Sequence, residues 1–183
     1  MILIVDINYK KESLGYYEFV LPIASIVSNH EKFAVKHFSE IKHDRTDDYR
    51  QIILSGAALK DGVCLDHVNE FEWVEQCKRP ILGICAGMQV IGLVFGSSLE
   101  RCLEIGMREI KTTKENPLFS SAFKAYELHN HSIRPSTEFD VLAESDSCIQ
   151  AVKHKKRGIY GVLFHPEVRN EEILERFILM HEE

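Results

Sequence analysis

Cys85 is the residue of this sequence whose surroundings point most directly to covalent chemistry. It stands in the segment Gly83-Ile84-Cys85-Ala86-Gly87, directly after an apolar run and directly before a helical pattern. The pattern G-x-C-x-G is typical of a nucleophile elbow, with cysteine in the position usually occupied by serine. The free N–H groups and the dipole of a helix N-terminus favour a thiolate over a thiol. The segment therefore predicts a cysteine nucleophile.

The neighbours of Cys85 suit a sharp turn from strand to helix. Gly83 and Gly87 stand where a Cβ would collide with neighbouring backbone. The backbone N–H of Ala86 is then placed to stabilise an oxyanion. The alternative is an inert core cysteine, which is the commonest state of a free thiol among apolar residues. This segment alone leaves both interpretations open.

A histidine and a carboxylate far downstream favour the catalytic interpretation. The apolar run Ile159–Phe164 ends in His165, and Glu167 follows two residues later. A cysteine nucleophile requires a base and a group that orients the base. If Ile159–Phe164 and the run before Cys85 are both strands, the three side chains can meet at one edge of a sheet. We therefore predict a Cys85, His165 and Glu167 triad.

The two segments together resemble the class I glutamine amidotransferases. That family carries G-I-C-x-G-x-Q followed by G-V-Q-F-H-P-E, and this chain reads Gly83–Gln89 and Gly161–Glu167, with Leu163 the one departure. The resemblance spans nearly the whole chain. It implies that Cys85 hydrolyses L-glutamine to glutamate and ammonia through a thioester. No cofactor and no metal is implied.

The resemblance also implies the second half of the oxyanion hole. Family members usually carry S-G-G-P where this chain has Ser55-Gly56-Ala57-Ala58. A backbone N–H of Gly56 or Ala57 is the implied donor, alongside that of Ala86. Ala57 replaces a glycine, so we expect backbone strain there if the position needs a positive φ.

Four further residues are candidates for binding the substrate. Gln89 lies one helical turn after Cys85, and the resemblance implies that it grips the glutamine, whereas a plain capping or solvated role is the alternative. The segment His129, Asn130 and His131 matches a family segment whose backbone binds the α-amino and α-carboxylate groups. Two ordinary strand histidines are the competing interpretation. Nearby spacing supplies no further ligands for a metal at these histidines.

Alternating apolar and helical segments predict the elements that position these residues. We expect strands at residues 2–7, 33–38, 52–54, 81–84, 108–113, 125–133, 139–144, 149–154 and 159–164, and helices at 16–29, 66–78, 86–95 and after the cap Asn170. Pro22 either kinks the first helix or marks a late start. This order predicts an α/β three-layer sandwich with a mostly parallel central sheet, flavodoxin-like, in one domain over residues 1–183.

Composition excludes several other classes. The formal net charge is −6, which argues against binding nucleic acid, and the basic cluster Lys153–Arg157 is interpreted as a hairpin tip. No apolar stretch is long enough to span a membrane, and no signal peptide is recognised, so we expect a cytoplasmic protein. Five scattered cysteines form neither a disulfide framework nor a zinc ribbon.

The resemblance implies that the ammonia passes to a synthetase partner of the ATP-pyrophosphatase type, on a separate subunit. The segments Glu144–His154, Ile159–Val162 and Pro166–Val168 are most similar to glutaminase subunits of GMP synthase. The segment Asp6–Tyr9 instead resembles the glutaminase subunits of anthranilate and aminodeoxychorismate synthase. Two alternatives from other classes remain: a stand-alone γ-glutamyl hydrolase, and an inactive regulatory module suggested by Ala57, Ala58 and Leu163.

Overall fold

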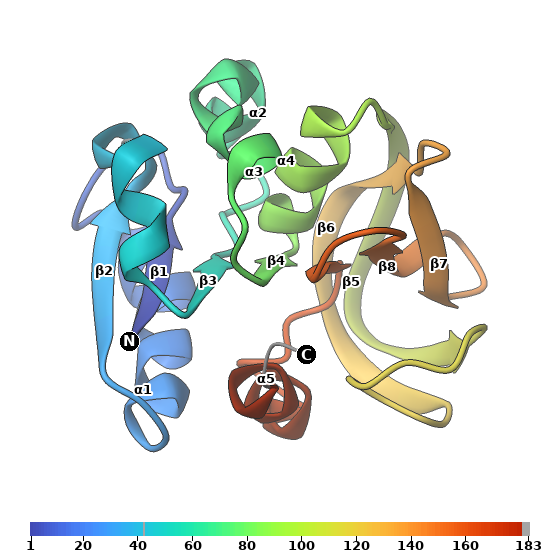
Figure 1. Cartoon of the computed structure of the whole chain (residues 1–183). Coiled ribbons are helices and arrows are strands. Elements are labelled where there is room, and N and C mark those ends of the chain that lie inside the picture. The colour runs from blue at the N-terminus through green and yellow to red at the C-terminus, as the bar shows by residue number, and fades with distance from the viewer. Residues whose placement is uncertain (42, 181–183) are drawn as a thin grey trace.

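A single mixed sheet organises the part of the chain that the computed structural model describes, which is residues 1–41 and 43–180. The sheet has nine strands in the order β2-β1-β3-β4-β9-β8-β7-β5-β6 (Figure 1). The strands are β1 (Ile2–Asp6), β2 (Phe33–His37), β3 (Gln51–Leu54), β4 (Ile81–Ile84), β5 (Ser98–Thr112), β6 (Phe123–Arg134), β7 (Phe139–Glu144), β8 (Ile149–His154) and β9 (Ile159–Val162).

The first half of the sheet is parallel. Strands β2, β1, β3, β4 and β9 pair in parallel, and this order is that of a flavodoxin-like sheet. Every residue of β1, β3, β4 and β9 is buried, as expected for strands covered on both faces. The carboxyl ends of these strands meet at one edge, where open α/β sheets bind their ligands.

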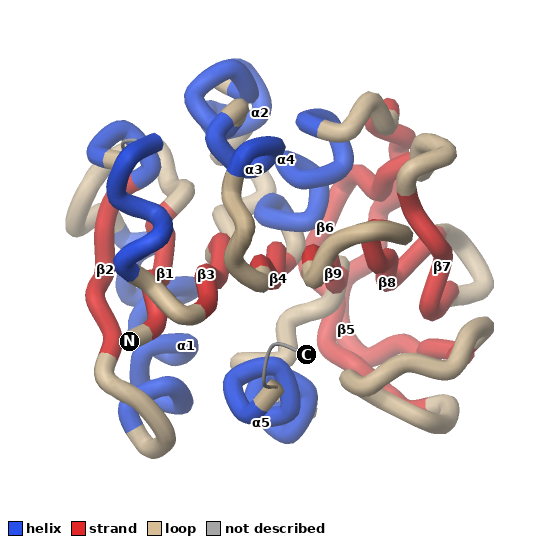
Figure 2. The backbone as a smooth tube through the Cα atoms, in the orientation of Figure 1, coloured by secondary structure: helices blue, strands red, loops and turns tan. Residues whose placement is uncertain are grey.

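Helices cover both faces of this parallel half and complete three layers. Helices α1 (Leu21–Ser28) and α5 (Glu171–Leu179) lie on one face and share a core cluster (Figure 2). Helices α2 (Val63–Asp66), α3 (Trp73–Gln76) and α4 (Ala86–Val94) lie on the other. The predicted α/β class and layered architecture agree with this arrangement. No helix among the described residues is long and apolar enough to cross a membrane.

The second half of the sheet is antiparallel and curls away from the first. Strands β9, β8, β7, β5 and β6 pair antiparallel in that order, so the whole sheet is mixed. The long β5–β6 ribbon is interrupted by a β-bulge, because Arg101 pairs with His131 while Glu104 pairs with His129. The bulge leaves one extra residue on β5 and re-aims the local backbone. This strand is also much longer than the strand predicted at residues 108–113.

The prediction of one continuous helix at residues 66–78 was wrong. The structure has α2, a 3-10 turn at Val68–Phe71, and α3 in its place. His67 leaves the helical region with φ −118° and ψ 37°, and its Nδ1 lies 2.9 Å from the Val63 carbonyl oxygen. The break lets Phe71 and Trp73 pack into one apolar cluster, which a single straight helix does not allow.

The two terminal helices also differ in detail from the prediction. A π-helical turn, Tyr16–Val20, precedes α1, and Pro22 lies in the first turn of α1, which corresponds to the late start. Asn170 precedes α5 as predicted but has φ 75° and makes no capping hydrogen bond through its side chain. The predicted apolar stripe of α5, Ile173, Leu174, Phe177 and Ile178, is buried.

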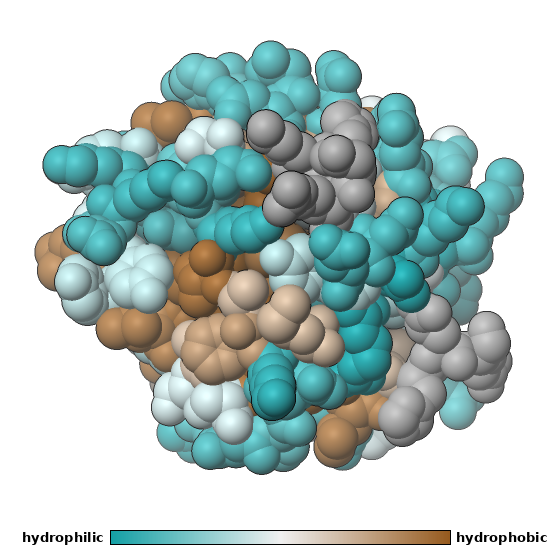
Figure 3. Space-filling view, turned by 60° about the vertical axis from the view of Figure 1, so that its left-hand side comes forward, coloured by the Kyte–Doolittle hydropathy of each residue, from teal (hydrophilic) through white to brown (hydrophobic). Residues whose placement is uncertain are grey.

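The edge of the sheet formed by β2 keeps part of its apolar surface open. Seen from that side, hydrophobic side chains gather in the middle of the face and hydrophilic ones border them (Figure 3). The exposed large apolar residues of the neighbouring segments include Leu14, Tyr17, Leu21 and Phe33. The described elements therefore do not cover this edge completely.

Candidate active site

Cys85 occupies a strained position between β4 and α4. Its backbone has φ 50° and ψ −107°, a conformation that side-chain-bearing residues rarely adopt. The packing around it explains the two glycines: a Cβ at Gly83 would stand 2.5 Å from the Gly87 backbone, and one at Gly87 would stand 2.7 Å from the Leu54 carbonyl oxygen. The sharp strand-to-helix turn predicted from the sequence is present. Strain that the surrounding structure holds in place is common where a side chain must point into a site.

The pairing of β4 with β9 brings His165 to Cys85. Ile84 lies opposite Val162 in the parallel register, and the Cys85 N–H donates to the Val162 carbonyl at 2.8 Å. Residues that follow these two strands therefore emerge at the same edge. The backbone N–H of His165 is fixed in turn by the Tyr126 carbonyl of β6, at 2.9 Å.

His165 and Glu167 form a buried hydrogen-bonded pair. The His165 Nδ1 lies 2.7 Å from Glu167 Oε1, and both side chains are almost wholly inaccessible to solvent. Burial by itself lowers the pKa of His165, but the charges of Glu167 and Cys85 raise this pKa well above its usual value. The Nε2 atom has no hydrogen-bond partner among the described residues. That nitrogen is therefore available to exchange a proton beside Cys85.

The loop after β3 closes the site from the other side. A Cβ placed on Gly56 would stand 2.9 Å from His165 Cε1, so this glycine allows the loop to approach the imidazole ring. Ala57 is buried and is not among the described residues with positive φ, so the condition under which we expected backbone strain at Ala57 is not met. The replacement of glycine by alanine is accommodated because the local φ is one that alanine adopts freely.

A cavity of about 190 Å³ opens onto Cys85. Drug-sized ligands occupy pockets of roughly 300–1,000 Å³, so this space suits a smaller molecule of amino-acid size. Its walls are the segment Ala57–Gly62, Leu65, Cys85, Ala86, Gln89 and the segment Leu128–His131. The structure thus gathers the candidates Ala57, Ala86, Gln89, His129, Asn130 and His131 around Cys85, with Gly56 beside His165.

The far wall of the cavity is held by polar contacts that sequence reasoning did not foresee. The Gln89 Nε2 donates to the His131 carbonyl at 2.7 Å, and the Asn130 Nδ2 donates to the Leu59 carbonyl at 3.0 Å. Cys85 Sγ lies 3.6 Å from the Leu128 carbonyl oxygen. These contacts tie the β6 wall to the helix and to the loop opposite. No signal in the sequence indicates them, because each joins residues 42 to 71 positions apart.

His129 differs from its neighbours in where its side chain lies. The ring is buried behind the wall, and Nδ1 lies 3.0 Å from the Cys102 carbonyl oxygen. Only the backbone of His129 can therefore face the cavity. The His129 ring also lies near Cys102, Glu104, Glu127 and Cys148, which are potential metal ligands from other parts of the chain. Spacing in the sequence does not indicate this cluster, because its members come from separate segments of the chain.

The arrangement has the parts needed for acyl transfer to sulfur. A thiol at a helix N-terminus faces an imidazole that a carboxylate orients, and the backbone N–H of Ala86 lies at the same helix start. These groups can form and hydrolyse a thioester from a small amide. The small volume of the cavity, about 190 Å³, favours a compact substrate.

Comparisons with known proteins agree with this chemistry. The family model for glutamine amidotransferase class-I matches residues 23–179. The A-subunit of glutamine-hydrolysing GMP synthase from Methanocaldococcus jannaschii is 37% identical over 134 residues, which cover 63% of this chain and 71% of that protein. Its counterpart in Pyrococcus furiosus is 33% identical over 137 residues, covering 69% and 73%.

Two solved structures share the fold. A protein from Thermoplasma acidophilum, described as the A-subunit of a GMP synthase, has a TM-score of 0.83 at 25% identity, covering 97% of this chain and 92% of that chain. A glutamine amidotransferase from Thermotoga maritima has a TM-score of 0.71 at 19% identity, covering 97% and 80%. The second likeness concerns the fold alone.

Proposed function

The chain belongs to the class I glutamine amidotransferase family, and we propose that it is the glutamine-hydrolysing subunit of a GMP synthase. In this proposal the chain acts as one glutaminase domain and releases ammonia from L-glutamine. A separate synthetase subunit of the ATP-pyrophosphatase type uses the ammonia to convert XMP to GMP. The support for this choice of partner is the similarity to the glutamine-hydrolysing GMP synthase subunits of several archaea.

One observation carries the proposed chemistry. Cys85 stands in a strained turn beside the buried His165–Glu167 pair, and the cavity next to it has room for a single amino acid. An inert core cysteine would need neither the strained backbone nor a buried ion pair. Both features cost free energy, and such costs concentrate at functional sites.

The first half-reaction forms a thioester. The Cys85 thiolate attacks the side-chain carboxamide carbon of glutamine, and the carbonyl electrons move onto the oxygen. The N–H groups of Ala86 and of Gly56 or Ala57 stabilise that oxyanion. When the oxyanion collapses, the C–N bond breaks and His165 gives its proton to the departing nitrogen, which leaves as ammonia.

The second half-reaction restores the enzyme. Water attacks the thioester carbonyl while His165 Nε2 accepts a proton from it, and the C–S bond then breaks to yield glutamate and the Cys85 thiolate. Glu167 fixes the imidazole orientation through Nδ1 and stabilises its positive charge in both steps. The raised pKa of His165 suits this role, because the imidazolium form is the one that must protonate the leaving nitrogen.

The walls of the cavity orient the substrate. The Gln89 Nε2 is already engaged by the His131 carbonyl, so its Oε1 remains to accept a hydrogen bond from the carboxamide of glutamine. The backbone of His129, Asn130 and His131 binds the α-amino and α-carboxylate groups. Because Asn130 also bonds Leu59, the two sides of the cavity are held at a fixed distance.

The test is glutamate release from L-glutamine by the wild type and by Cys85→Ala. Each is assayed alone, with a GMP synthetase subunit, and with that subunit plus ATP and XMP. We expect release that depends on Cys85 and rises with the synthetase and its nucleotides. Full glutaminase turnover by Cys85→Ala would refute the assignment of Cys85 as the nucleophile. Cys85-dependent release that does not change when the synthetase is added would refute the assignment of a GMP synthetase partner. It would favour a stand-alone hydrolase or a subunit of another synthase.

A further inference from the structure

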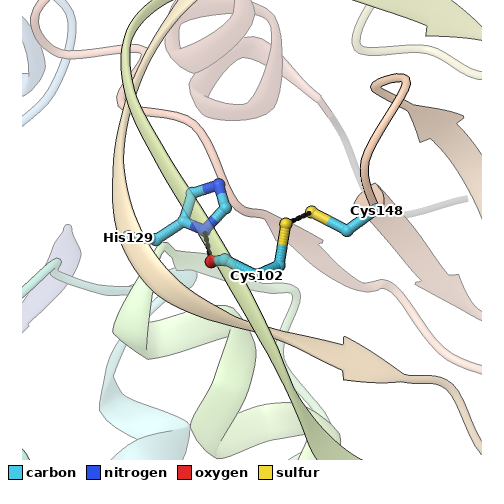
Figure 4. A group of neighbouring side chains, drawn as sticks. All are labelled: Cys102, His129 and Cys148. Atoms are coloured by element: carbon cyan, nitrogen blue, oxygen red, sulfur yellow. Dashed lines mark hydrogen bonds between the residues drawn. The ribbon is translucent and has the colours of Figure 1, made fainter.

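A buried cluster of metal-binding side chains lies behind the β6 wall of the cavity. Cys102 and Glu104 come from the bulged part of β5, Glu127 and His129 from β6, and Cys148 from the turn between β7 and β8. Four of these five residues are less than a tenth exposed, and Cys148 is intermediate. Figure 4 shows Cys102, His129 and Cys148 turned toward one another.

The surroundings of His129 fix its tautomer. Nδ1 lies 3.0 Å from the Cys102 carbonyl oxygen, and a carbonyl can only accept a hydrogen bond. Nδ1 must therefore carry a proton, and in the neutral ring Nε2 presents a lone pair. Histidines that bind metals usually donate their other ring N–H in this way, which orients the ring and makes it a better ligand.

The Nε2 atom of His129 faces two carboxylates. Glu127 Oε2 lies 3.2 Å away and Glu104 Oε2 lies 3.4 Å away. Nε2 and both Glu127 oxygens are buried, and none of them has a hydrogen-bond partner in the described part of the chain. With a neutral His129 ring and two ionised glutamates, these three atoms repel one another away from water unless a cation lies between them.

We propose that this cluster binds one divalent metal ion of the zinc type. His129 Nε2, Glu104 and Glu127, whose ligand atoms lie within 4.8 Å of one another, are three of the ligands, and the thiolate of Cys148, from the neighbouring group of Cys102, His129 and Cys148, completes the set. Around a tetrahedral zinc, nitrogen and oxygen ligands lie about 3.3 Å apart, and oxygen and sulfur about 3.5 Å apart. The structure has 3.2 Å and 3.4 Å for the first kind of pair. It has 3.6 Å between Glu104 Oε2 and Cys148 Sγ for the second.

The mixture of donors selects the metal. A set of imidazole, carboxylate and thiolate suits zinc, whereas magnesium and calcium prefer oxygen ligands alone. Two sulfur ligands of one zinc lie about 3.8 Å apart. Cys102 Sγ is only 2.8 Å from Cys148 Sγ, so the two cannot both be ligands in this geometry. Cys102 instead contributes its carbonyl, which holds the ring of His129.

Further side chains support the ligands. Gln150 Nε2 donates to Glu104 Oε2 at 2.7 Å, Ser145 Oγ donates to the same atom at 3.0 Å, and Arg108 Nε lies 3.7 Å from Glu104 Oε1. Such outer contacts are typical of a carboxylate that is held ready for a cation. The bound ion would fasten β5 and β6 to the β7–β8 turn. It would thereby stabilise the wall that carries Leu128–His131, without touching the substrate.

The experiment begins with the full-length wild-type protein, purified without chelator under reducing conditions. We expect about one equivalent of zinc by elemental analysis after dialysis. The metal-free protein should bind added Zn²⁺ with a rise in melting temperature. Replacement by Co²⁺ should give the visible spectrum of a tetrahedral site and a sulfur-to-cobalt charge-transfer band. That band requires a thiolate ligand, which acidic surface residues cannot provide.

Paired variants test the choice of ligands. Cys148→Ser should abolish the charge-transfer band and weaken zinc binding at least about 100-fold, and Glu104→Gln should weaken binding at least about tenfold. Cys102→Ser is the matched control, because its side chain is not a ligand, and it should keep both the metal and the band. Loss of the band in Cys102→Ser with retention in Cys148→Ser would overturn the assignment.

Two results in the wild-type protein would overturn the site itself. One is reduced protein that retains no metal and shows neither a melting shift with Zn²⁺ nor a cobalt spectrum. The other is a chain whose mass is two hydrogens lower and whose Cys102 and Cys148 are joined as a disulfide, with no metal bound. Both results are obtained with the wild-type protein, so neither can be explained by a variant that fails to fold.

Discussion

Gly56 and His165 approach each other so closely that a methyl group on the glycine would stand 2.9 Å from the imidazole Cε1 atom. The glycine thus sets the position of the ring as well as the path of the loop. We expect Gly56→Ala to displace His165 and to lower kcat at least about tenfold, with a much smaller change in KM. Glutamate release at saturating and limiting glutamine measures both. Gly158→Ala is the control, because its new Cβ would meet Pro80 at an ordinary 3.6 Å; equal losses in both variants would contradict the prediction.

Glu167→Gln should lower kcat by a factor of about 10²–10⁴, because the amide keeps the size of the side chain but loses the charge that orients and stabilises the imidazolium. The folded structure should persist, as judged by circular dichroism. A variant that keeps more than half of the wild-type kcat would show that the hydrogen bond to His165 Nδ1 does not serve the reaction. Glu171→Gln, on the exposed start of α5, controls for the loss of one negative charge.

The pKa of His165 is raised in the folded state, which predicts a pH dependence of stability. A raised pKa contributes stability that is complete below the unfolded value of about 6.5 and is lost as pH rises through the folded value. The melting temperature of the wild type should therefore fall from about pH 6.5 upward more steeply than that of Glu167→Gln. Parallel curves for the two proteins over this range would contradict the assignment of the shift to Glu167.

Cys85→Gly should be more stable than Cys85→Ala by about 1 kcal/mol. Both variants lose the sulfur and the activity, but only glycine relieves the backbone strain at φ 50°. The greater freedom of glycine in the unfolded chain offsets part of this gain. Urea unfolding of the two variants, compared at the same m-value, gives the difference. An alanine variant of equal or greater stability would contradict the predicted advantage of glycine.

One thiol of the five should react with a glutamine-like electrophile at pH 7. Burial raises the pKa of Cys64 to about 12 and also raises the pKa of Cys77 and Cys102. Reaction requires a free thiolate, so these three should stay unlabelled while Cys85 is modified, and Cys148 should be protected by the proposed metal. Peptide mass spectrometry identifies the labelled residue, and excess glutamine should protect it. Labelling of Cys64 or Cys77 at a comparable rate would contradict this selectivity.

The sequence by itself determined where the proposed reactive centre lies, and most of the sheet. The segments Gly83–Gln89 and Phe164–Glu167 contain the turn, the proposed nucleophile and the proposed base with its carboxylate within a few residues each, so each pattern can be recognised locally. The strands at residues 81–84, 139–144 and 149–154 were predicted with the bounds that the structure has. A buried strand can be recognised from its own continuous apolar run, without knowing which strand it pairs with.

Tertiary structure alone decided how distant segments meet. The approach of Gly56 to His165, the hydrogen bond from Gln89 to the His131 carbonyl and the contact of His129 with Glu104 all join different elements. The break of the predicted helix at His67 has the same origin, since packing of Phe71 and Trp73 outweighed helical periodicity. Local propensities are worth tenths of a kcal/mol per residue, whereas burying one large apolar side chain is worth about 1.5–3 kcal/mol. Contacts of that kind depend on the register of the folded chain, which no single segment of the sequence specifies.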